Sequence, residues 1–227
     1  MAEIHRPKIV RDGLILNLDA ADINSYPGSG TVWNDVSGNG FNGTLTNGPT
    51  FSNNVLVFDG INDYVETPTS IGAELAGNLT YCIWAKRDGN SASSINGLIS
   101  NEWHPEYTGI GIYLRNNDTQ ITVETGNGTS RPSYSLVHPT TNQNWTHYCL
   151  TYNSSIVTVY INGTLLDSRT APVTQNPARQ MVIGRWAPSY NSYYLNGRIS
   201  NAQTYNRALT AQEVLQNYNA TKTRFGL

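Results

Sequence analysis

Apolar and polar residues alternate in short runs along this chain, which is the pattern of strands with one buried face. Gly, Asn and Pro residues separate the runs. Frequent short strands with turn residues between them predict two packed antiparallel sheets rather than βαβ units. We therefore expect an all-β, two-sheet jelly-roll sandwich. The expected strand regions are 14–19, 55–64, 79–85, 109–115, 120–124, 145–152, 180–185 and 195–205, with 14–19 half-buried.

Two hairpins are expected within this series. Asn162-Gly163 separates the runs 156–161 and 164–169, and this dipeptide supplies the positive φ angles of a type I′ turn. The runs 109–115 and 120–124 are expected to pair in the same way around residues 116–118.

One short helix is expected near the C-terminus. Thr210 suits the N-cap, and Glu213 three residues later completes a capping box. Val214, Leu215 and Tyr218 are expected to form the buried side of this helix.

The 227 residues are expected to form a single domain, because no internal repeat or linker interrupts them. Residues 1–12 are a polar arm and residues 13–227 the domain. The arm either frays or reaches toward a neighbouring subunit. A fold of this length buries roughly 70–75% of its extended-chain surface, so it needs neither a metal nor a disulfide to be stable.

The charge balance argues against nucleic acid as a partner. The net charge is −2 with 13% charged residues, and no basic stripe is present. The first residues lack the apolar core of a signal peptide, and no run is long enough to span a bilayer, so we expect no membrane partner. A neutral surface rich in Asn, Thr, Ser and Tyr suits sugars or another protein.

The two cysteines, Cys82 and Cys149, both occur in apolar strand-like runs. Buried free thiols are the favoured interpretation. A cross-strand disulfide is the alternative if their Cα atoms come within about 7 Å.

The sequence offers no catalytic constellation. Glycosidases on sandwich folds use two Glu side chains on one strand, and the nearest feature here, Glu102 to Glu106, contains a Pro and is expected to be a loop. The four histidines lack ligand spacing, and no nucleophile elbow is present. We expect a protein that is not an enzyme.

Several aromatic residues fall in loop-like segments, where a ring can stack on the face of a sugar or anchor a neighbouring subunit. Arg131 and Arg185 are expected to assist either role. The alternative is that these loops pack on their own sandwich. The candidate ligand-binding residues are Trp103, Tyr107, Trp186, Tyr190, Tyr193 and Tyr194.

Five segments in order resemble the laminin-G-like, concanavalin A-like jelly-roll family. They are the glycine-rich segment 35–43, the run 57–65, Asn144-Trp-Thr-His-Tyr148, the hairpin 159–165 and the tail 197–214. The opening segments 9–20 and 25–30 and the closing segment 216–226 resemble the version of this fold found in virion structural proteins of tailed bacteriophages, cyanophages especially.

The resemblance implies a structural calcium ion at Asp19, Asp35, Asn39 and the pair Ser200-Asn201. Many relatives carry two acidic residues where this chain has Ser200 and Asn201, which weakens the attraction for a divalent ion. In the alternative, Asp35 caps a turn through Ser37 and Gly38, and no cofactor is required.

The resemblance also implies a function: a non-catalytic structural protein of a phage virion, either a head decoration or a tail-associated subunit. Its expected partners are other virion proteins, a glycan and further copies of itself. Its expected location is the virion, assembled in the host cytoplasm. A carbohydrate-binding module or lectin outside any virion is the alternative, and a glycoside hydrolase is the least favoured.

Overall fold

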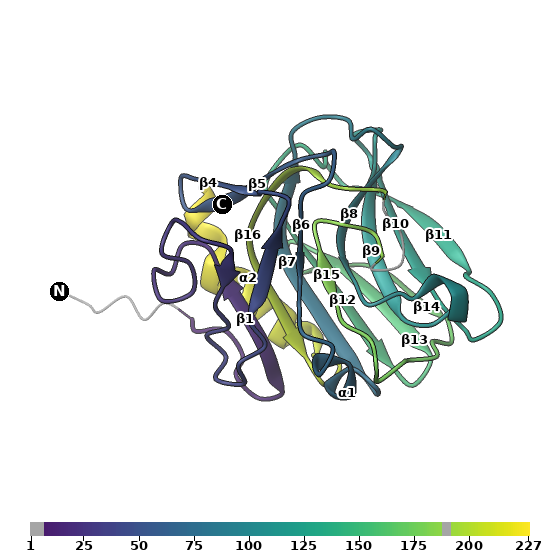
Figure 1. The fold of residues 1–227 in the computed structure, drawn as a ribbon. Coiled ribbons are helices and arrows are strands. Elements are labelled where there is room, and N and C mark those ends of the chain that lie inside the picture. The colour runs from purple at the N-terminus through teal and green to yellow at the C-terminus, as the bar shows by residue number, and fades with distance from the viewer. Residues whose placement is uncertain (1–6, 188–191) are drawn as a thin grey trace.

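The computed structural model describes residues 7–187 and 192–227, which fold into two antiparallel sheets packed face to face (Figure 1). The expected all-β sandwich is confirmed. In the first sheet, sheet A, the strand order is β14-β13-β12-β7-β16-β5-β4, and β1 also pairs with β16. Its strands are β1 Leu14–Asp19, β4 Thr50–Ser52, β5 Val55–Asp59, β7 Leu79–Arg87, β12 Thr146–Asn153, β13 Ile156–Ile161, β14 Thr164–Thr170 and β16 Asn196–Tyr205.

The second sheet, sheet B, has the order β11-β10-β9-β8-β15-β6-β3-β2. Its strands are β2 Val32–Trp33, β3 Gly43–Thr46, β6 Tyr64–Glu66, β8 Ile95–Ser100, β9 Ile110–Arg115, β10 Gln120–Thr125, β11 Ser133–Val137 and β15 Val182–Ile183. The helical elements are α1 Ile71–Glu74, η1 His104–Glu106, α2 Ala211–Thr221 and η2 Lys222–Phe225. Alternate residues from both sheets meet in the core, where Leu16, Trp33 and Ile83 are fully buried.

The expected strand 55–64 divides into two strands that belong to different sheets. The chain leaves β5 of sheet A, turns at Gly60 with φ +78°, and enters β6 of sheet B. The Asp59 carboxylate accepts the Ile61 amide at 2.8 Å, which fixes the turn. The prediction of one strand was wrong because hydrophobic alternation continues across a sheet-to-sheet crossing.

Strand β1 is buried along its whole length, so the expected half-exposure was wrong. Asn17 and Asp19, which should face solvent, are 6% and 8% exposed. Segments distant in sequence cover them: Arg224 forms an ion pair with Asp19 at 2.7 Å, and residues 7–11 lie beside the strand.

The two expected hairpins are confirmed. Ile161 pairs with Thr164 across the turn, and Asn162 and Gly163 have φ angles of 53° and 77°, as a type I′ turn requires. Strands β9 and β10 pair over five residue positions, from Leu114 opposite Ile121 onward.

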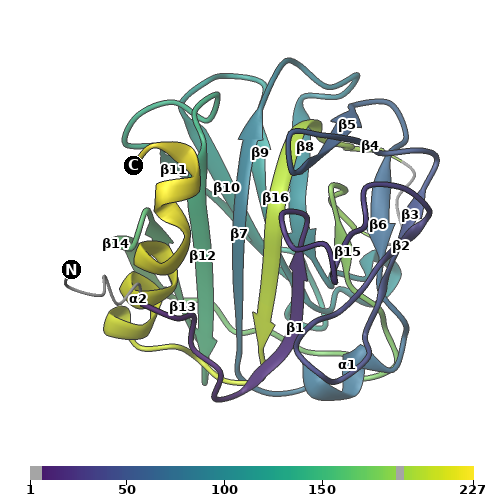
Figure 2. The same cartoon turned by 90° about the vertical axis from the view of Figure 1, so that its left-hand side faces the viewer.

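Helix α2 lies against the outer face of sheet A (Figure 2). The expected capping box between Thr210 and Glu213 is present. Leu215, however, is 44% exposed, whereas Asn217 and Thr221 are buried. Val214 is fully buried, as expected, and Tyr218 is partly buried, so the prediction was wrong for Leu215. The helix also turns polar side chains inward: Thr221 accepts the Trp84 indole N–H at 2.7 Å.

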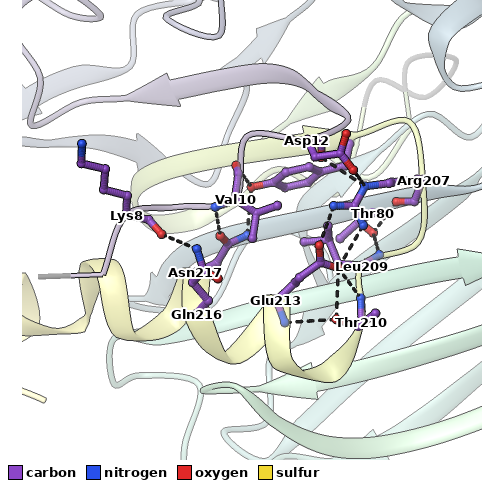
Figure 3. Close-up of polar contacts among 11 residues, drawn as sticks. Lys8, Val10, Asp12, Thr80, Arg207, Leu209, Thr210, Glu213, Gln216 and Asn217 are labelled. Atoms are coloured by element: carbon purple, nitrogen blue, oxygen red, sulfur yellow. Dashed lines mark hydrogen bonds and ion pairs between the residues drawn. The ribbon is translucent and has the colours of Figure 1, made fainter.

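Residues 8–10 are hydrogen-bonded to helix α2 and to the end of β16 (Figure 3). The Asn217 side chain accepts the Val10 amide at 2.8 Å, and the Tyr205 hydroxyl donates to the Val10 carbonyl at 3.1 Å. The Gln216 amide donates to the Lys8 carbonyl at 2.7 Å. These three bonds tie the beginning of the described chain to its last helix.

Cys82 and Cys149 form a disulfide, with their Cα atoms 4.1 Å apart. The expectation of free thiols was wrong because β7 and β12 pair in a register that places these two residues directly opposite each other. The alternating pattern shows that both are buried, but only the register shows that they meet.

Candidate functional site

The segment 184–195 carries most of the candidate aromatic residues, and its described parts, 184–187 and 192–195, lie against β8 of sheet B. Gly97 permits this approach, because a Cβ there would lie 2.1 Å from the Arg185 carbonyl carbon. The Gly97 amide also donates to the Tyr193 carbonyl at 3.0 Å. The loop is therefore held against the strand at both of its described ends.

Trp186 anchors this loop and is 5% exposed. Its ring packs edge-on against Tyr193 at 5.0 Å and against Tyr113 of β9 at 6.4 Å. The Arg131 guanidinium covers it at 4.8 Å. Trp186 thus packs on its own sandwich, as the alternative interpretation anticipated, and it supports Tyr193 from below.

Two carboxyl groups lie beneath this aromatic cluster. Glu124 of β10 accepts the Tyr113 hydroxyl at 3.2 Å and the Arg131 guanidinium at 2.8 Å. Glu102, 2% exposed, has no well-aligned hydrogen-bond partner for either carboxyl oxygen among the described residues. Burial raises the pKa of Glu102 well above its ordinary value, and the charge of Glu124 raises it further. Burial also raises the pKa of Glu124, against the opposing charge of Arg131.

Tyr193 and Tyr194 line an open hollow of about 210 Å³, which we call the rim hollow. Ile61, in the β5–β6 turn, contributes an apolar side chain that is 67% exposed. Tyr193 is partly exposed, whereas Tyr194 is 8% exposed and packs against Tyr64, with ring centroids 6.2 Å apart. The hollow thus combines one accessible ring, an aliphatic surface and hydroxyl groups. Its lining residues include Gly60, Ile61, Ser93, Ser192, Tyr193 and Tyr194.

The other candidate aromatic residues are divided between two environments. Trp103 is covered by the Arg179 guanidinium, which lies 3.9 Å above its ring. Tyr107 is 36% exposed and follows η1 with φ 52°. The His104 ring lies between Tyr107, at 5.8 Å, and Trp186, at 6.3 Å, and so joins the two loops. Tyr190 lies outside the described residues.

The residues proposed for calcium are occupied by protein partners. The Asp35 carboxylate accepts the amides of Asn17, Ser37 and Phe41 and the hydroxyl of Ser37. Asn39 directs its NH₂ group to two backbone carbonyls of β1.

Asp19 is paired across the strands with Asn201, but its carboxylate is held by Arg224. Calcium requires six to eight oxygen ligands, whereas this arrangement uses its carboxylates to accept N–H groups and includes a guanidinium cation. The donor set therefore does not fit a calcium ion. Within the described ranges, no group of three or more His, Cys, Asp or Glu side chains could hold a metal.

Sequence reasoning missed Ile61, Tyr113 and Glu124 as members of this region. Tyr113 and Glu124 alternate with core residues in their strands, so their side chains point to the outer face, which the pattern alone does not distinguish from the core face. Ile61 had a readable signal, because an apolar residue between Gly60 and Asn62 in a tight turn has little core within reach.

Comparisons with known proteins agree with this fold. The family model described as the concanavalin A-like lectin/glucanases superfamily matches residues 59–215. No curated protein matches the chain. No helix among the described residues is long and apolar enough to cross a membrane.

Solved structures resemble the chain in fold at low sequence identity. The Trypanosoma rangeli sialidase in complex with sialic acid has a TM-score of 0.70 and 18% identity, over 93% of this chain and 33% of the sialidase. The receptor binding domain of botulinum neurotoxin C/D mosaic serotype has a TM-score of 0.69 and 15% identity, over 93% and 52% of the two chains. The CBM40 of Ruminococcus gnavus IT-sialidase bound to α2,3-sialyllactose has a TM-score of 0.52 and 15% identity, over 63% of this chain and 83% of the CBM40. The chain thus spans about a third of the sialidase it resembles.

Proposed function

Because the chain belongs to the concanavalin A-like lectin/glucanase superfamily, we propose that it is a non-catalytic glycan-binding domain that uses the rim hollow. The observation that carries this proposal is the composition of that hollow, where the partly exposed ring of Tyr193 lies beside exposed Ile61 and the hydroxyls of two serines. Aromatic and aliphatic faces stack on the C–H face of a sugar ring, and hydroxyls bond its polar edge.

Two of the structural neighbours add support of a weaker kind. The CBM40 is described as bound to α2,3-sialyllactose, and the sialidase as in complex with sialic acid. At sequence identities of 15% and 18%, these neighbours support an inference about the fold of this chain but not about its ligand. They make α2,3-sialyllactose a reasonable first probe, alongside a broad glycan array.

The arrangement of acidic residues supports a role without catalysis. A glycosidase needs two accessible carboxyl groups about 5–10 Å apart that flank the scissile bond. Glu102 and Glu124 lie below the aromatic cluster at 2% and 7% exposure, so a sugar ring in the rim hollow meets the ring of Tyr193 rather than carboxylates. Hydrolysis of a polysaccharide by the purified chain would contradict this part of the proposal.

The test compares glycan binding by the wild type, Tyr193→Ala and Tyr193→Phe. We expect Tyr193→Ala to weaken binding about tenfold and Tyr193→Phe to retain most of it, because the ring face provides the contact. Leu165→Ala is the matched control, since Leu165 is 57% exposed on a distant hairpin. Equal affinity for wild type and Tyr193→Ala would refute the placement of the site, and the absence of any glycan ligand would refute the function.

We further propose that this domain is a structural subunit of a tailed-phage virion, with other virion proteins and copies of itself as partners. The support is the likeness of segments 9–20 and 216–226 to that subgroup. Assembly in the host cytoplasm would keep Cys82 and Cys149 reduced until the particle is released, since cytosolic disulfides are rare. Mass spectrometry of purified phage particles tests the proposal. Absence of this chain from every particle would refute it.

A further inference from the structure

A second hollow, of about 390 Å³, opens on the other side of the molecule, between β1, residues 7–11 and the C-terminal helical segment. We call it the terminal hollow. It lies on the outer face of sheet A, whereas Arg185, Trp186 and Tyr193 lie against β8 of sheet B. Its volume falls in the range of pockets that hold a small ligand, about 300–1,000 Å³. The residues used below are Lys8, Arg11, Asn17, Asp19, Asp22, Gln203 and Arg224.

The floor of the terminal hollow consists of two amide side chains from neighbouring strands. Asn17 of β1 and Gln203 of β16 are directly opposite each other in the register, and they are 6% and 4% exposed. The side-chain oxygen Oδ1 of Asn17 is buried and accepts no hydrogen bond from any residue in 7–187 or 192–227. An unpaired buried acceptor costs about 1–3 kcal/mol, so this position favours a hydrogen-bond donor supplied from the hollow.

The rim of the terminal hollow carries an excess of positive charge. Arg224 is already neutralised by Asp19, at 2.7 Å. Lys8 and Arg11 are exposed, and their charged groups form no ion pair with another described residue. Figure 3 shows the Lys8 side chain extending away from helix α2, while its backbone carbonyl stays bonded to Gln216. The backbone of the segment is therefore fixed, and the two cations are available to an anion.

We propose that the terminal hollow binds an acidic sugar residue, that is, a ring with several hydroxyls and one carboxylate. Hydroxyl hydrogens would satisfy the Asn17 oxygen and the carboxylate of Asp22, which also lines the hollow. The carboxylate of the ligand would meet Lys8 and Arg11. Inorganic phosphate matches less well, because a dianion would also face Asp19 and Asp22 and offers few donors to an amide floor. This site is independent of the rim hollow.

The test uses the full-length chain labelled with ¹⁵N and follows the side-chain NH₂ signals of Asn17 and Gln203 by NMR. The probes are D-glucuronate, the neutral methyl glucoside and inorganic phosphate. We expect D-glucuronate to shift both signals in a saturable way with millimolar affinity, and the neutral sugar to leave them in place. Unmoved signals at about 50 mM D-glucuronate, far above a millimolar Kd, would overturn the proposal. Equal saturable shifts with phosphate would also overturn it, because the hollow would then bind anions in general.

Two variants locate the interaction. Lys8→Ala with Arg11→Ala removes exposed charge and should weaken D-glucuronate binding at least tenfold, with folding unaffected. Gln203→Met keeps the volume but removes the amide, and it should abolish the shift at Asn17. Arg169→Ala is the matched control, since its side chain is 40% exposed on β14. Tyr193→Ala should leave D-glucuronate binding here unchanged, so a failure of the rim hollow and a failure of this site are distinguishable. Unchanged affinity in the Lys8/Arg11 variant would overturn the assignment.

Discussion

Replacing Glu213 tests how the last helix is held on the sandwich. The carboxylate of Glu213 accepts two bonds from Arg207, at 2.9 and 2.6 Å, and accepts the Thr210 amide at 2.9 Å (Figure 3). The Glu213 amide in turn donates to the Thr210 hydroxyl at 3.3 Å. Glu213→Gln keeps a side-chain acceptor for the Thr210 amide but removes the ion pair. Glu213→Ala removes both, while the Thr210 hydroxyl still accepts the amide of residue 213.

The magnitude follows from these contacts. Losing the one hydrogen bond from the Thr210 amide costs about 0.5–1 kcal/mol, and a partly exposed Arg–carboxylate pair contributes about 0.5–1 kcal/mol. We therefore expect Glu213→Ala to lower the free energy of unfolding by about 1–2 kcal/mol and Glu213→Gln by about 0.5–1 kcal/mol. The Arg207 guanidinium, together with the Thr210 bonds, lowers the pKa of Glu213 to about 2. The carboxylate is 26% exposed and water screens the ion pair, so the pair contributes no more than the range given above.

The sign of the pH dependence is fixed by that lowered pKa. The stabilisation is fully present above the unfolded value of about 4.3 and is lost as the pH falls toward 2. Urea unfolding at pH 7, 4 and 2.5 should thus show the difference between wild type and Glu213→Gln shrinking with acid. Glu74→Gln, on an exposed carboxylate, serves as the control and should change stability by less than about 0.5 kcal/mol. A difference independent of pH, or zero coupling between Glu213 and Arg207 in a double-mutant cycle, would refute the reasoning.

Four further predictions follow from the buried groups. Burial lowers the pKa of His147 to about 3 and of His138 to about 4; the unfolded chain therefore binds more protons below pH 6.5, and stability should fall with acid by about 1.4 kcal/mol per pH unit per histidine. Urea unfolding at several pH values should show that His147→Phe lowers the slope of the free energy of unfolding against pH by the amount that one proton contributes. An unchanged slope would contradict the lowered pKa of His147. Gly97→Ala should destabilise by about 3 kcal/mol and alter tryptophan fluorescence, because its Cβ would strike the Arg185 backbone, whereas Gly77→Ala, in open space, should melt almost like the wild type. Reduction of the unfolded chain followed by refolding breaks the buried Cys82–Cys149 bond, which spans 67 residues, and should remove about 4 kcal/mol and lower the melting temperature; an unchanged melting temperature after this treatment would contradict a stabilising disulfide. Chelation with EDTA should leave the melting temperature unchanged, because Asp19 and Asp35 already have protein partners; a clear drop would reinstate calcium.

The elements that depend on local signals could be predicted from sequence. The Asn162-Gly163 turn and the Thr210–Glu213 capping box are each encoded within a few residues, and both are present. The division of residues 55–64 between two sheets could not be predicted, because it depends on which partner strand each half meets. The same applies to the disulfide, since register is a property of two strands and not of one.

The candidate sites were less predictable than the fold for a related reason. An aromatic residue in a loop can face solvent or pack on its own sheet, and the sequence of 184–195 is compatible with both. In the structure Trp186 packs on the sheet and is 5% exposed, whereas Tyr193 is partly exposed to solvent. The terminal hollow involves β1, β16 and both ends of the described chain, so no local pattern reveals it.

The bonds between residues 8–10 and the last helix have a mechanical consequence. Tension applied to the chain at residue 7 is borne first by the hydrogen bonds of Lys8 and Val10, and only afterwards by the ladder between β1 and β16. Stretching in an optical trap should give a small early yield, followed by a larger rupture of the sandwich. These hydrogen bonds would then break first and reduce the shear on the remaining strands.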